Sequence, residues 1–475
     1  MMRIITTDQL EPGILSRNFE AVRHGIARNH ALVSILTGAF LGGLLIISPW
    51  LSLAAALFLI YCLASLVKPV LLCYVTIIAT ALTSGMERGK LIPFLIPNEP
   101  VLLLSAALAF FIVMTRKRLY SSSLHLINTA IAFLITGTML IPAMTYLLRG
   151  TVFTVKDMLN LLAPIQYVIL FWLFANIPGN ENDRKWILRL MLVCGIIVAA
   201  IGLLQAGGIT VVNNFLHKWY GSSHELTAVD SGRITSLMSA WNGLGIFLMV
   251  NIFISAAFAL TRPGDLGTGL IYVSLIICTI ALIVTGSYAS LAGLALGIFC
   301  ISIFLRGINY KALLLLSGLA AAGLITYLVF QAFILKRADQ QFGYGGIVPA
   351  TLIDRFRIWH DIYLPAIQKN PIFGVFLSIP QTYSWQYTES QYLSLLFSFG
   401  LVGFIAFFLW IAISVRWLFQ RMNQSRSLTK PIAAIGISIF LVLSVTGFTN
   451  AVFTYSGTAD YLWILLALAA YRQEA

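Results

Sequence analysis

The sequence predicts an all-α, polytopic integral membrane protein with about 12–14 transmembrane helices. Of the 475 residues, 59% are hydrophobic and only 10% are charged, and the mean hydropathy is +0.91. A soluble domain carries roughly 25% charged residues, whereas here the deficit extends over the whole chain. Apolar windows long enough to cross a bilayer recur from residue 31 to residue 471. We therefore expect a single transmembrane domain over residues 1–475 and no separate soluble domain.

The first 30 residues are polar and basic, and they contain neither an apolar core nor a small-residue cleavage site. We therefore interpret residues 1–30 as a cytoplasmic lead-in to the first span and not as a signal peptide. A helix needs roughly 17–25 apolar residues to cross the hydrocarbon core. This window predicts spans at 31–48, 51–67, 69–85, 97–114, 125–146, 158–177, 186–207, 236–260, 266–285, 288–305, 311–331, 391–414, 431–448 and 454–471.

The distribution of positive charge predicts the orientation of these spans. With the N-terminus inside and the loops alternating, 19 of the 30 Lys and Arg residues fall in inside loops and 11 in outside loops. The inside loops are also shorter, so the positive-inside rule places both termini in the cytoplasm. The net charge of +13 then reflects cytoplasmic loops beside anionic lipid headgroups. We expect membrane lipids as partners and no nucleic acid.

Two long loops, residues 208–235 and 332–390, fall on the same external face. The first contains VVNNFLHKWYG and the second contains RFRIWHDIYLPAIQKN. Each pattern is typical of a short amphipathic helix in the membrane interface. The second helix should stop at Asn370-Pro371 because proline cannot continue a helix. Long loops in compact proteins are commonly functional, so we expect chemistry at the mouth of the second loop.

The positions of the cysteines and the absence of known catalytic and nucleotide-binding motifs exclude several classes of enzyme. All five cysteines lie in apolar runs, and no Cys, His, Asp or Glu cluster has the spacing of a metal site. The sequence contains no P-loop, no G-x-S-x-G motif and no D-x-D pair in the external loops. We expect no metal, no cofactor and no nucleotide-sugar or ATP chemistry.

Arg233 and Asn242 are the first candidate site residues. Arg233 lies just before the span that carries Asn242. A guanidinium at the bilayer edge can bind phosphate in a bidentate manner, although it can also simply reach the headgroups. An amide inside a span needs a partner, so Asn242 either joins helices or lines a site.

The second loop contributes Arg355, Arg357, Trp359 and His360. The two arginines are two residues apart, so on a helix they do not share a face, and only one is expected to point into a site. Trp359 fits an aromatic belt at the membrane surface and equally a stacking platform for a sugar ring. His360 is a possible base, but a bystander role is the simpler interpretation.

Glu389 precedes the span at 391–414 and should sit at the membrane surface. Two interpretations are open. The carboxylate can act as a general base for a reacting hydroxyl. Alternatively it is a solvated acid that complements the helix dipole, because the segment TESQ is close to a capping box.

The order of these residues, across roughly residues 190–415, resembles the O-antigen ligase and polymerase superfamily. The motifs that carry the resemblance are Arg233 with Asn242, Ser287-Tyr288-Ala289-Ser290, Arg355…Trp359…Pro371…Gly374, and Glu389…Tyr392-Leu393…Gly400-Leu401-Val402-Gly403. The N-terminal spans match only in hydropathy.

The resemblance implies a GT-C-like membrane glycosyltransferase on the periplasmic face of the bacterial inner membrane. The implied donor is a glycan on undecaprenyl pyrophosphate, used without metal or nucleotide sugar. Arg233 and Arg355 would stabilise the pyrophosphate leaving group and Glu389 would position or deprotonate the acceptor hydroxyl. The implied contacts to the pyrophosphate or the glycan are Arg357, Asn242, Trp359, His360 and Tyr392.

Two departures from the family pattern bear on the function. Ligases of the family usually carry a His-Asn pair where this chain has Glu389-Ser390, which favours a polymerase of O-antigen or exopolysaccharide. An arginine sometimes found at a helix start is replaced by Tyr288, and Lys336 or Arg337 are candidates to take its place. A polymerase would be expected to have a chain-length regulator as a partner.

Two alternatives remain open at this point. One is a ligase that transfers the glycan to lipid A–core. The other is a transporter of polysaccharide or lipid without covalent chemistry. Transporters carry charges near the bilayer centre, whereas charged residues are nearly absent from the span centres of this chain. This distribution favours catalysis at the surface.

Overall fold

The structure is a computed structural model of the whole chain. It describes residues 49–471 except 93–94, 117–124, 151, 221–231, 262, 306–309, 343–348, 376, 378, 380–387, 425–427 and 456. The described residues form helices and no strand beyond two isolated bridges. The prediction of an all-α membrane protein is therefore confirmed, while the predicted segments 1–30 and 31–48 lie outside the described residues.

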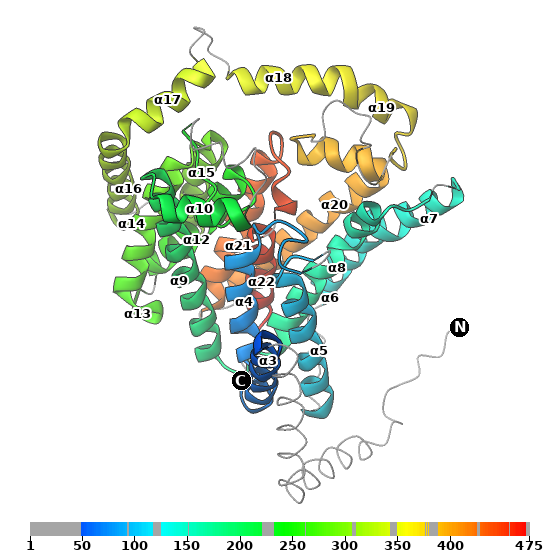
Figure 1. The fold of residues 1–475 in the computed structure, drawn as a ribbon, viewed down its shortest axis with the longest axis horizontal. Helices are drawn as coiled ribbons and strands as arrows, with labels where there is room; N and C mark the ends of the chain where they lie inside the picture. The colour runs from blue at the N-terminus through cyan, green and yellow to red at the C-terminus, as the bar shows by residue number, and fades with distance from the viewer. Residues whose placement is uncertain are drawn as a thin grey trace, which may run out of the picture.

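Figure 1 shows the order of the helices along the chain. In the first half they are α3 (Pro49–Val67), α4 (Leu71–Thr83), α5 (Asn98–Arg116), α6 (His125–Ile135), η3 (Thr136–Leu140), α7 (Ile141–Leu148), α8 (Val155–Asn176), α9 (Glu181–Ala206) and α10 (Thr210–Trp219). In the second half they are α12 (Trp241–Thr261), α13 (Pro263–Leu266), α14 (Thr268–Val284), α15 (Tyr288–Leu305), α16 (Tyr310–Val329), α17 (Gln331–Phe342), α18 (Ala350–Ile358), η5 (Trp359–Tyr363), α19 (Leu364–Lys369), α20 (Gln391–Gln424), α21 (Thr429–Thr446), η6 (Val452–Thr454) and α22 (Thr458–Ala470).

Each predicted span from 51–67 onward coincides with a helix. Among the described residues, eight helices are long and apolar enough to cross a membrane, or nine if a bent pair in α16 and α17 counts as one span. Four further apolar helices, Ala56–Val67, Leu71–Thr83, Thr268–Val284 and Thr458–Ala470, are shorter. The multi-pass architecture is thus established, and the total of 12–14 spans stays a prediction.

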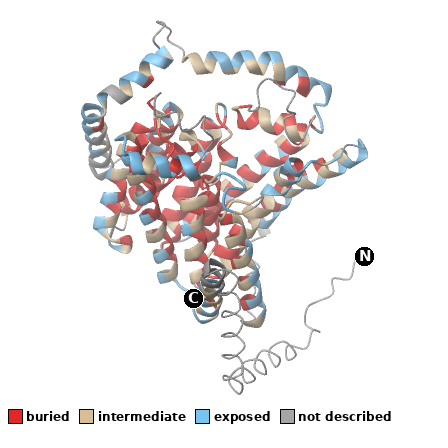
Figure 2. Ribbon diagram, viewed as in Figure 1, coloured by how far each residue is buried: buried red, intermediate tan, exposed pale blue. Residues whose placement is uncertain are grey.

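The centre of the bundle is formed by α12, α21 and α22, whose residues are almost all buried (Figure 2). Helix α12 is apolar all round, which is the pattern of a helix enclosed on every side. Its small residues allow close packing: a Cβ at Gly245 would lie 2.5 Å from the Ser290 hydroxyl on α15. The core therefore excludes α12 from lipid and fixes its two ends.

Arginines close one end of the bundle. Arg184 is 1% exposed and donates to the carbonyl oxygen of Leu468 at 2.7 Å. Arg421 donates to the carbonyls of Ala469, Ala470 and Tyr471, so two guanidinium groups bind the free carbonyls at the end of α22. The starts of α12, α15, α20 and α22 lie at the opposite end.

Short helices are present in both long loops, as predicted. Helix α10 exposes Val211 and Phe215 while Leu216 is buried, which suits a helix at the membrane surface. In the second loop, α18, η5 and α19 form one continuous helix over residues 350–369, which we call the loop helix. It ends at Asn370 before Pro371, as predicted. Figure 1 shows it lying across the end of the bundle.

Helix α20 is broken at Gly400, which has φ 62° and ψ −163°. The turn that begins at Pro371 fills this break. Leu401 N–H donates to the carbonyl oxygen of Pro371 at 2.8 Å, and Val375 N–H donates to that of Phe397 at 2.7 Å. A Cβ at Gly400 would come within 2.3 Å of the Ile372 carbonyl oxygen. The predicted span at 391–414 thus falls in a helix that is long and apolar enough to cross a membrane, but that helix is broken at Gly400, which the sequence pattern does not reveal.

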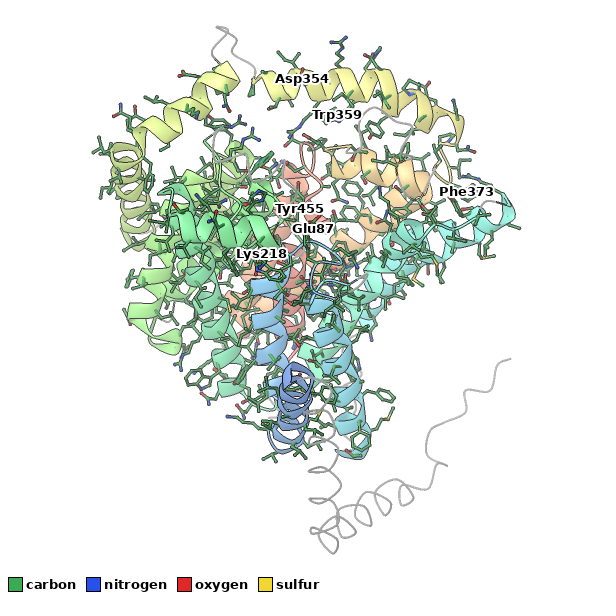
Figure 3. All side chains as sticks on the ribbon, in the orientation of Figure 1. Glu87, Lys218, Asp354, Trp359, Phe373 and Tyr455 are labelled. Carbon is green, nitrogen blue, oxygen red and sulfur yellow. The ribbon has the colours of Figure 1, made fainter. Side chains whose placement is uncertain are left out.

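Residues from the first half of the chain also donate hydrogen bonds to the turn that begins at Pro371. Arg149, at the end of α7, donates to the carbonyl oxygen of Gly374 at 2.9 Å. Asn160 on α8 donates to that of Leu377 at 3.2 Å. Figure 3 shows Phe373 beside α7. The loop helix is thus tied to the bundle through the turn that follows it.

The interlock of the turn and the break predicts a matched pair of glycine variants. Gly400→Ala should destabilise the protein by about 1–3 kcal/mol, because φ 62° with ψ −163° is a conformation essentially confined to glycine, and by a further ~1–3 kcal/mol through overlap with the Ile372 carbonyl. Gly208 also has a positive φ of 72°, but no atom lies within 4 Å of its Cβ position. Gly208→Ala should therefore show only the strain. Thermal unfolding of both purified variants measures the difference, and equal losses would contradict the interlock.

Candidate active site

An ion pair joins the loop helix to the start of α20. The Nε of Arg355 on α18 donates to Oε2 of Glu389. The Arg355 side chain is 18% exposed and that of Glu389 is 32% exposed, so the pair is partly shielded from water. This contact brings together two of the three residues that the sequence assigned to catalysis.

Glu389 is held in an unusual backbone conformation, with φ +49°. For a residue with a Cβ this left-handed conformation is uncommon and strained. The next residues secure it, because Gln391 N–H donates to the carbonyl oxygen of Gly447 at 2.8 Å and the Gln391 side chain accepts from Phe453 N–H at 3.1 Å. From this backbone conformation the Glu389 carboxylate contacts Arg355.

Ser390, and not Glu389, caps α20. The Ser390 hydroxyl accepts from the Leu393 N–H at 3.4 Å, which is the capping geometry at a helix start. The Glu389 side chain contacts Arg355 instead. The alternative interpretation of Glu389 as a solvated capping acid is therefore not supported by its contacts.

Trp359 fixes the loop helix beside Glu389. Its indole N–H donates to the carbonyl oxygen of Thr388 at 2.7 Å, and its ring lies edge-on to Phe356 at 5.2 Å between centroids. In Figure 3 Asp354 and Trp359 lie on the loop helix over the end of the bundle. Trp359 thus positions the loop helix, and its predicted contact with a glycan stays a prediction.

Arg357 and His360 point away from this ion pair. Each side chain is 84% exposed, and each contacts Asp361: Arg357 at 3.8 Å and His360 Nδ1 at 2.9 Å. The two arginines of the loop helix therefore do occupy different faces, and Arg355 is the one that faces the bundle. The predicted substrate contacts of Arg357 and His360 stay predictions, and neither side chain contacts the ion pair of Arg355 and Glu389.

Arg233 stacks on Trp241 at the start of α12, with its Cζ 4.1 Å from the ring centroid. Residues 234–238 between them are buried without forming a helix, and α12 begins five residues later than the predicted span at 236–260. Gln205 on α9 satisfies this backbone, because its Oε1 accepts from Thr235 N–H at 3.0 Å and from Ser236 N–H at 2.8 Å. Non-helical backbone at membrane depth requires such partners.

Asn242 belongs to a polar network that joins three parts of the bundle. Its Nδ2 donates to Oδ1 of Asn450 at 2.6 Å, and its Oδ1 accepts from the Ser287 hydroxyl at 3.0 Å. The Ser287 and Ser290 hydroxyls lie 2.9 Å apart. Asn242 therefore at least joins helices, and the network links α12, the start of α15 and the segment after α21.

Asn450 was missed by the sequence analysis. It is 3% exposed, and its carbonyl oxygen also accepts from Gln391 N–H at 3.2 Å. It thus connects the start of α20 with Asn242. It lies beyond the region 190–415 that carries the resemblance, and its only local signal is an amide between two apolar segments.

Tyr392 lies inside the bundle. It is 8% exposed, its hydroxyl donates to the carbonyl oxygen of Ser444, and its ring contacts Phe408 and Phe448 at 5.4 and 4.7 Å between centroids. These contacts show that Tyr392 packs against neighbouring helices at the start of α20. Its predicted contact with substrate stays a prediction.

Within the described part of the chain, no group of three His, Cys, Asp or Glu side chains is arranged to hold a metal ion. The arrangement offers other chemistry. A carboxylate can accept a proton, two guanidinium groups can bind an anion, and amides and hydroxyls can orient hydroxyl groups. All lie at the end of the bundle covered by the loop helix.

The fold and the site define a multi-pass α-helical membrane protein with a polar site at one end of its bundle. Residues 273–408 match the family model Wzy_C, described as O-antigen ligase. This match supports the O-antigen ligase and polymerase superfamily and confirms the recognition made from the motifs. No curated protein matches the chain. The matched region includes Ser287, Arg355 and Glu389, whereas Arg233 and Asn450 lie outside it.

Proposed function

We propose that this protein polymerises oligosaccharide repeat units linked to undecaprenyl pyrophosphate into a surface polysaccharide, O-antigen or exopolysaccharide. The reaction takes place on the periplasmic face of the bacterial inner membrane, without metal or nucleotide sugar. The family match indicates a membrane glycosyltransferase of ligase or polymerase type. The observation that carries the proposal is the ion pair of Arg355 and Glu389, because it brings a carboxylate and a guanidinium together at the end of the bundle that the loop helix covers.

The reaction assigns a distinct task to each group. A hydroxyl oxygen of the acceptor unit forms a bond to C1 of the donor sugar, and the bond between C1 and the pyrophosphate oxygen breaks. The pyrophosphate lipid leaves with the electron pair, and Glu389 accepts the proton of the hydroxyl. Arg355 and Arg233 stabilise the negative charge that develops on the leaving group. The proton of the hydroxyl is thus taken up by Glu389, and the negative charge of the leaving group is balanced by the two arginines.

Donor binding also frees the base. In the structure the Glu389 carboxylate contacts Arg355 and is not open to a hydroxyl on that side. A pyrophosphate that binds Arg355 competes with Glu389 for the same guanidinium. The carboxylate becomes available to the acceptor only when the donor is in place. In this order of events, Glu389 acts as a base only after a donor has bound.

The orientation of the bundle agrees with a periplasmic site. The end opposite the site contains Arg184, Lys185, Arg189 and Arg421, and the positive-inside rule assigns such an end to the cytoplasm. Both termini are then cytoplasmic. A chain-length regulator is the protein partner that a polymerase of this kind is expected to have.

A ligase is the second candidate function, because the matching family model is described as O-antigen ligase. A ligase would transfer the finished glycan to lipid A–core. Glu389-Ser390 stands where ligases of the superfamily usually carry His-Asn, and this difference favours the polymerase. A transporter is the third candidate, and the ion pair at the mouth of the bundle favours surface chemistry over transport.

The arginines can be tested together with the function in one assay. Purified protein is incubated with a lipid-linked repeat unit from its own organism, with no metal or nucleotide sugar added. We expect a ladder of products spaced by one repeat unit and release of the pyrophosphate lipid. Arg355→Ala and Arg233→Ala should each lower the rate on the order of 100-fold while the protein still inserts into the membrane. Arg357→Ala should stay near wild type, because that side chain is 84% exposed.

Each outcome of this assay decides between the candidates. A single product that forms only when lipid A–core is added would show a ligase. No covalent product from folded protein with the correct donor would favour a transporter. Ladders of wild-type yield from both arginine variants would reject the assignment of Arg355 and Arg233.

Replacing Glu389 with Gln tests the proton acceptor separately. We expect a rate lower by about 10²–10⁴-fold, because the amide keeps the size of the side chain but cannot take up a proton. Asp361→Asn is the matched control, since Asp361 is a carboxylate of the same loop and is 55% exposed. Its rate should be close to wild type. Full activity of Glu389→Gln would restrict Glu389 to an ion-pair role.

A further inference from the structure

A cavity of about 290 Å³ lies at the end of the bundle opposite the candidate active site. It is bounded by the connection between α3 and α4, by the end of α5, and by the connection between α8 and α9. Figure 1 shows α3 and α5 at this end, away from the loop helix. The volume is close to the lower limit of small-ligand pockets, which is roughly 300 Å³. The proposed reaction uses none of the residues that line this cavity.

Two side chains of opposite charge line the cavity without forming an ion pair. Lys68 lies in the connection between α3 and α4 and is exposed, and Asp183 lies in the first turn of α9 and is half-buried. Within the part of the chain that the structure describes, neither side chain forms an ion pair with any residue. A ligand with one positive and one negative group can pair with both, whereas a singly charged ligand leaves one of them unpaired.

The helix ends around the cavity are balanced in the same way. Helix α3 ends at Val67 and α8 ends at Asn176, and both residues line the cavity. Val70 precedes the start of α4 and Asn180 precedes the start of α9, and these residues line it too. Helix C-termini favour cations and helix N-termini favour anions. The backbone around the cavity therefore also favours a ligand that carries both charges.

The polar side chains offer acceptors for an ammonium group and donors for a phosphate. Asn176 Nδ2 donates to the carbonyl oxygen of Trp172 at 2.8 Å, which leaves its Oδ1 as an acceptor. Asn180 Oδ1 accepts from Asp183 N–H at 2.8 Å, which leaves its Nδ2 as a donor. Asp183 and Asn176 can thus accept from an ammonium group, and Lys68 and Asn180 can donate to a phosphate.

An apolar strip leads away from the cavity along α3. Val67 lines the cavity and is 84% exposed, and Leu63, which lies one turn earlier on the same face, is 63% exposed. Phe110 and Met114 on α5, a helix that packs against α3, are exposed as well. Exposed apolar side chains on spans face the lipid chains. A ligand can therefore place a polar group in the cavity and an acyl chain along this strip.

We infer that the cavity binds the headgroup of a phosphatidylethanolamine, a phospholipid with a phosphate and a primary ammonium group. The phosphate binds Lys68 and Asn180, and the ammonium group binds Asp183 and Asn176. A phosphatidylglycerol has no ammonium group and would leave Asp183 unpaired. The trimethylated ammonium of a phosphatidylcholine has no N–H to donate. The inference does not depend on the proposed reaction, because it concerns the other end of the bundle.

Lipid binding to the purified full-length protein tests this inference. Delipidated protein in detergent is titrated with phosphatidylethanolamine, phosphatidylglycerol and phosphatidylcholine of identical acyl chains, and native mass spectrometry gives the dissociation constants. We expect wild type to bind phosphatidylethanolamine roughly fivefold more tightly than either other lipid, because only this headgroup pairs with both charges.

Two variants separate the phosphate from the ammonium group. Asp183→Asn keeps an acceptor for Gly179 N–H but removes the negative charge. It should weaken phosphatidylethanolamine binding roughly fivefold and leave phosphatidylglycerol binding no weaker than in wild type. Lys68→Gln should weaken the binding of both lipids about threefold or more, because both carry the phosphate. Glu181→Gln is the matched control, since this carboxylate in the same turn lies 3.7 Å from Lys185, and its affinities should stay within about twofold of wild type.

Equal affinity of wild type for the three lipids would overturn the inference, and so would tighter binding of phosphatidylglycerol, which would show an anion site. Wild-type affinity of folded Asp183→Asn for phosphatidylethanolamine would overturn it as well. If Asp183→Asn does not fold, Lys68→Gln decides, because Lys68 is exposed in a connection between helices. Unchanged phosphatidylethanolamine affinity in Lys68→Gln would then overturn the inference.

Discussion

The ion pair between Arg355 and Glu389 is the contact on which the arrangement of the site depends. Its two partners are 34 residues apart in the chain, and they belong to a surface helix and to the first residues of a buried helix. An exposed ion pair contributes little stability, because water and salt screen it. This pair is partly shielded, so it can help to hold the loop helix over the bundle.

The rest of the structure keeps these partners in register. The turn after the loop helix fills the break in α20 at Gly400, and Arg149 binds the carbonyl of Gly374 from the other side. At the start of α20, Gln391 and Asn450 connect the strained Glu389 to the network around Asn242. The glycines in the motifs are thus explained by backbone contact. The polar network, by contrast, satisfies amides that would otherwise be costly to bury.

Much of the fold could be predicted from the sequence, because each helix across a bilayer must be apolar over a fixed length, and this requirement is local. The end of the loop helix at Asn370 and the separation of Arg355 from Arg357 followed from equally local rules. The break at Gly400, the support of the 232–240 segment by Gln205 and the role of Asn450 could not be predicted. Each depends on contacts between segments far apart in the chain, and an isolated Asn or Gln in an apolar stretch gives no sign of its partner.

A double-mutant cycle on Arg355 and Glu389 tests the central contact most directly, and it requires no substrate. The free energy of unfolding is measured for wild type, Arg355→Gln, Glu389→Gln and the double variant, in detergent at low salt. We expect a coupling energy on the order of 1 kcal/mol that decreases as salt is added. Strictly additive effects of the two changes would contradict it, because the loop helix and α20 would then be held together by other contacts.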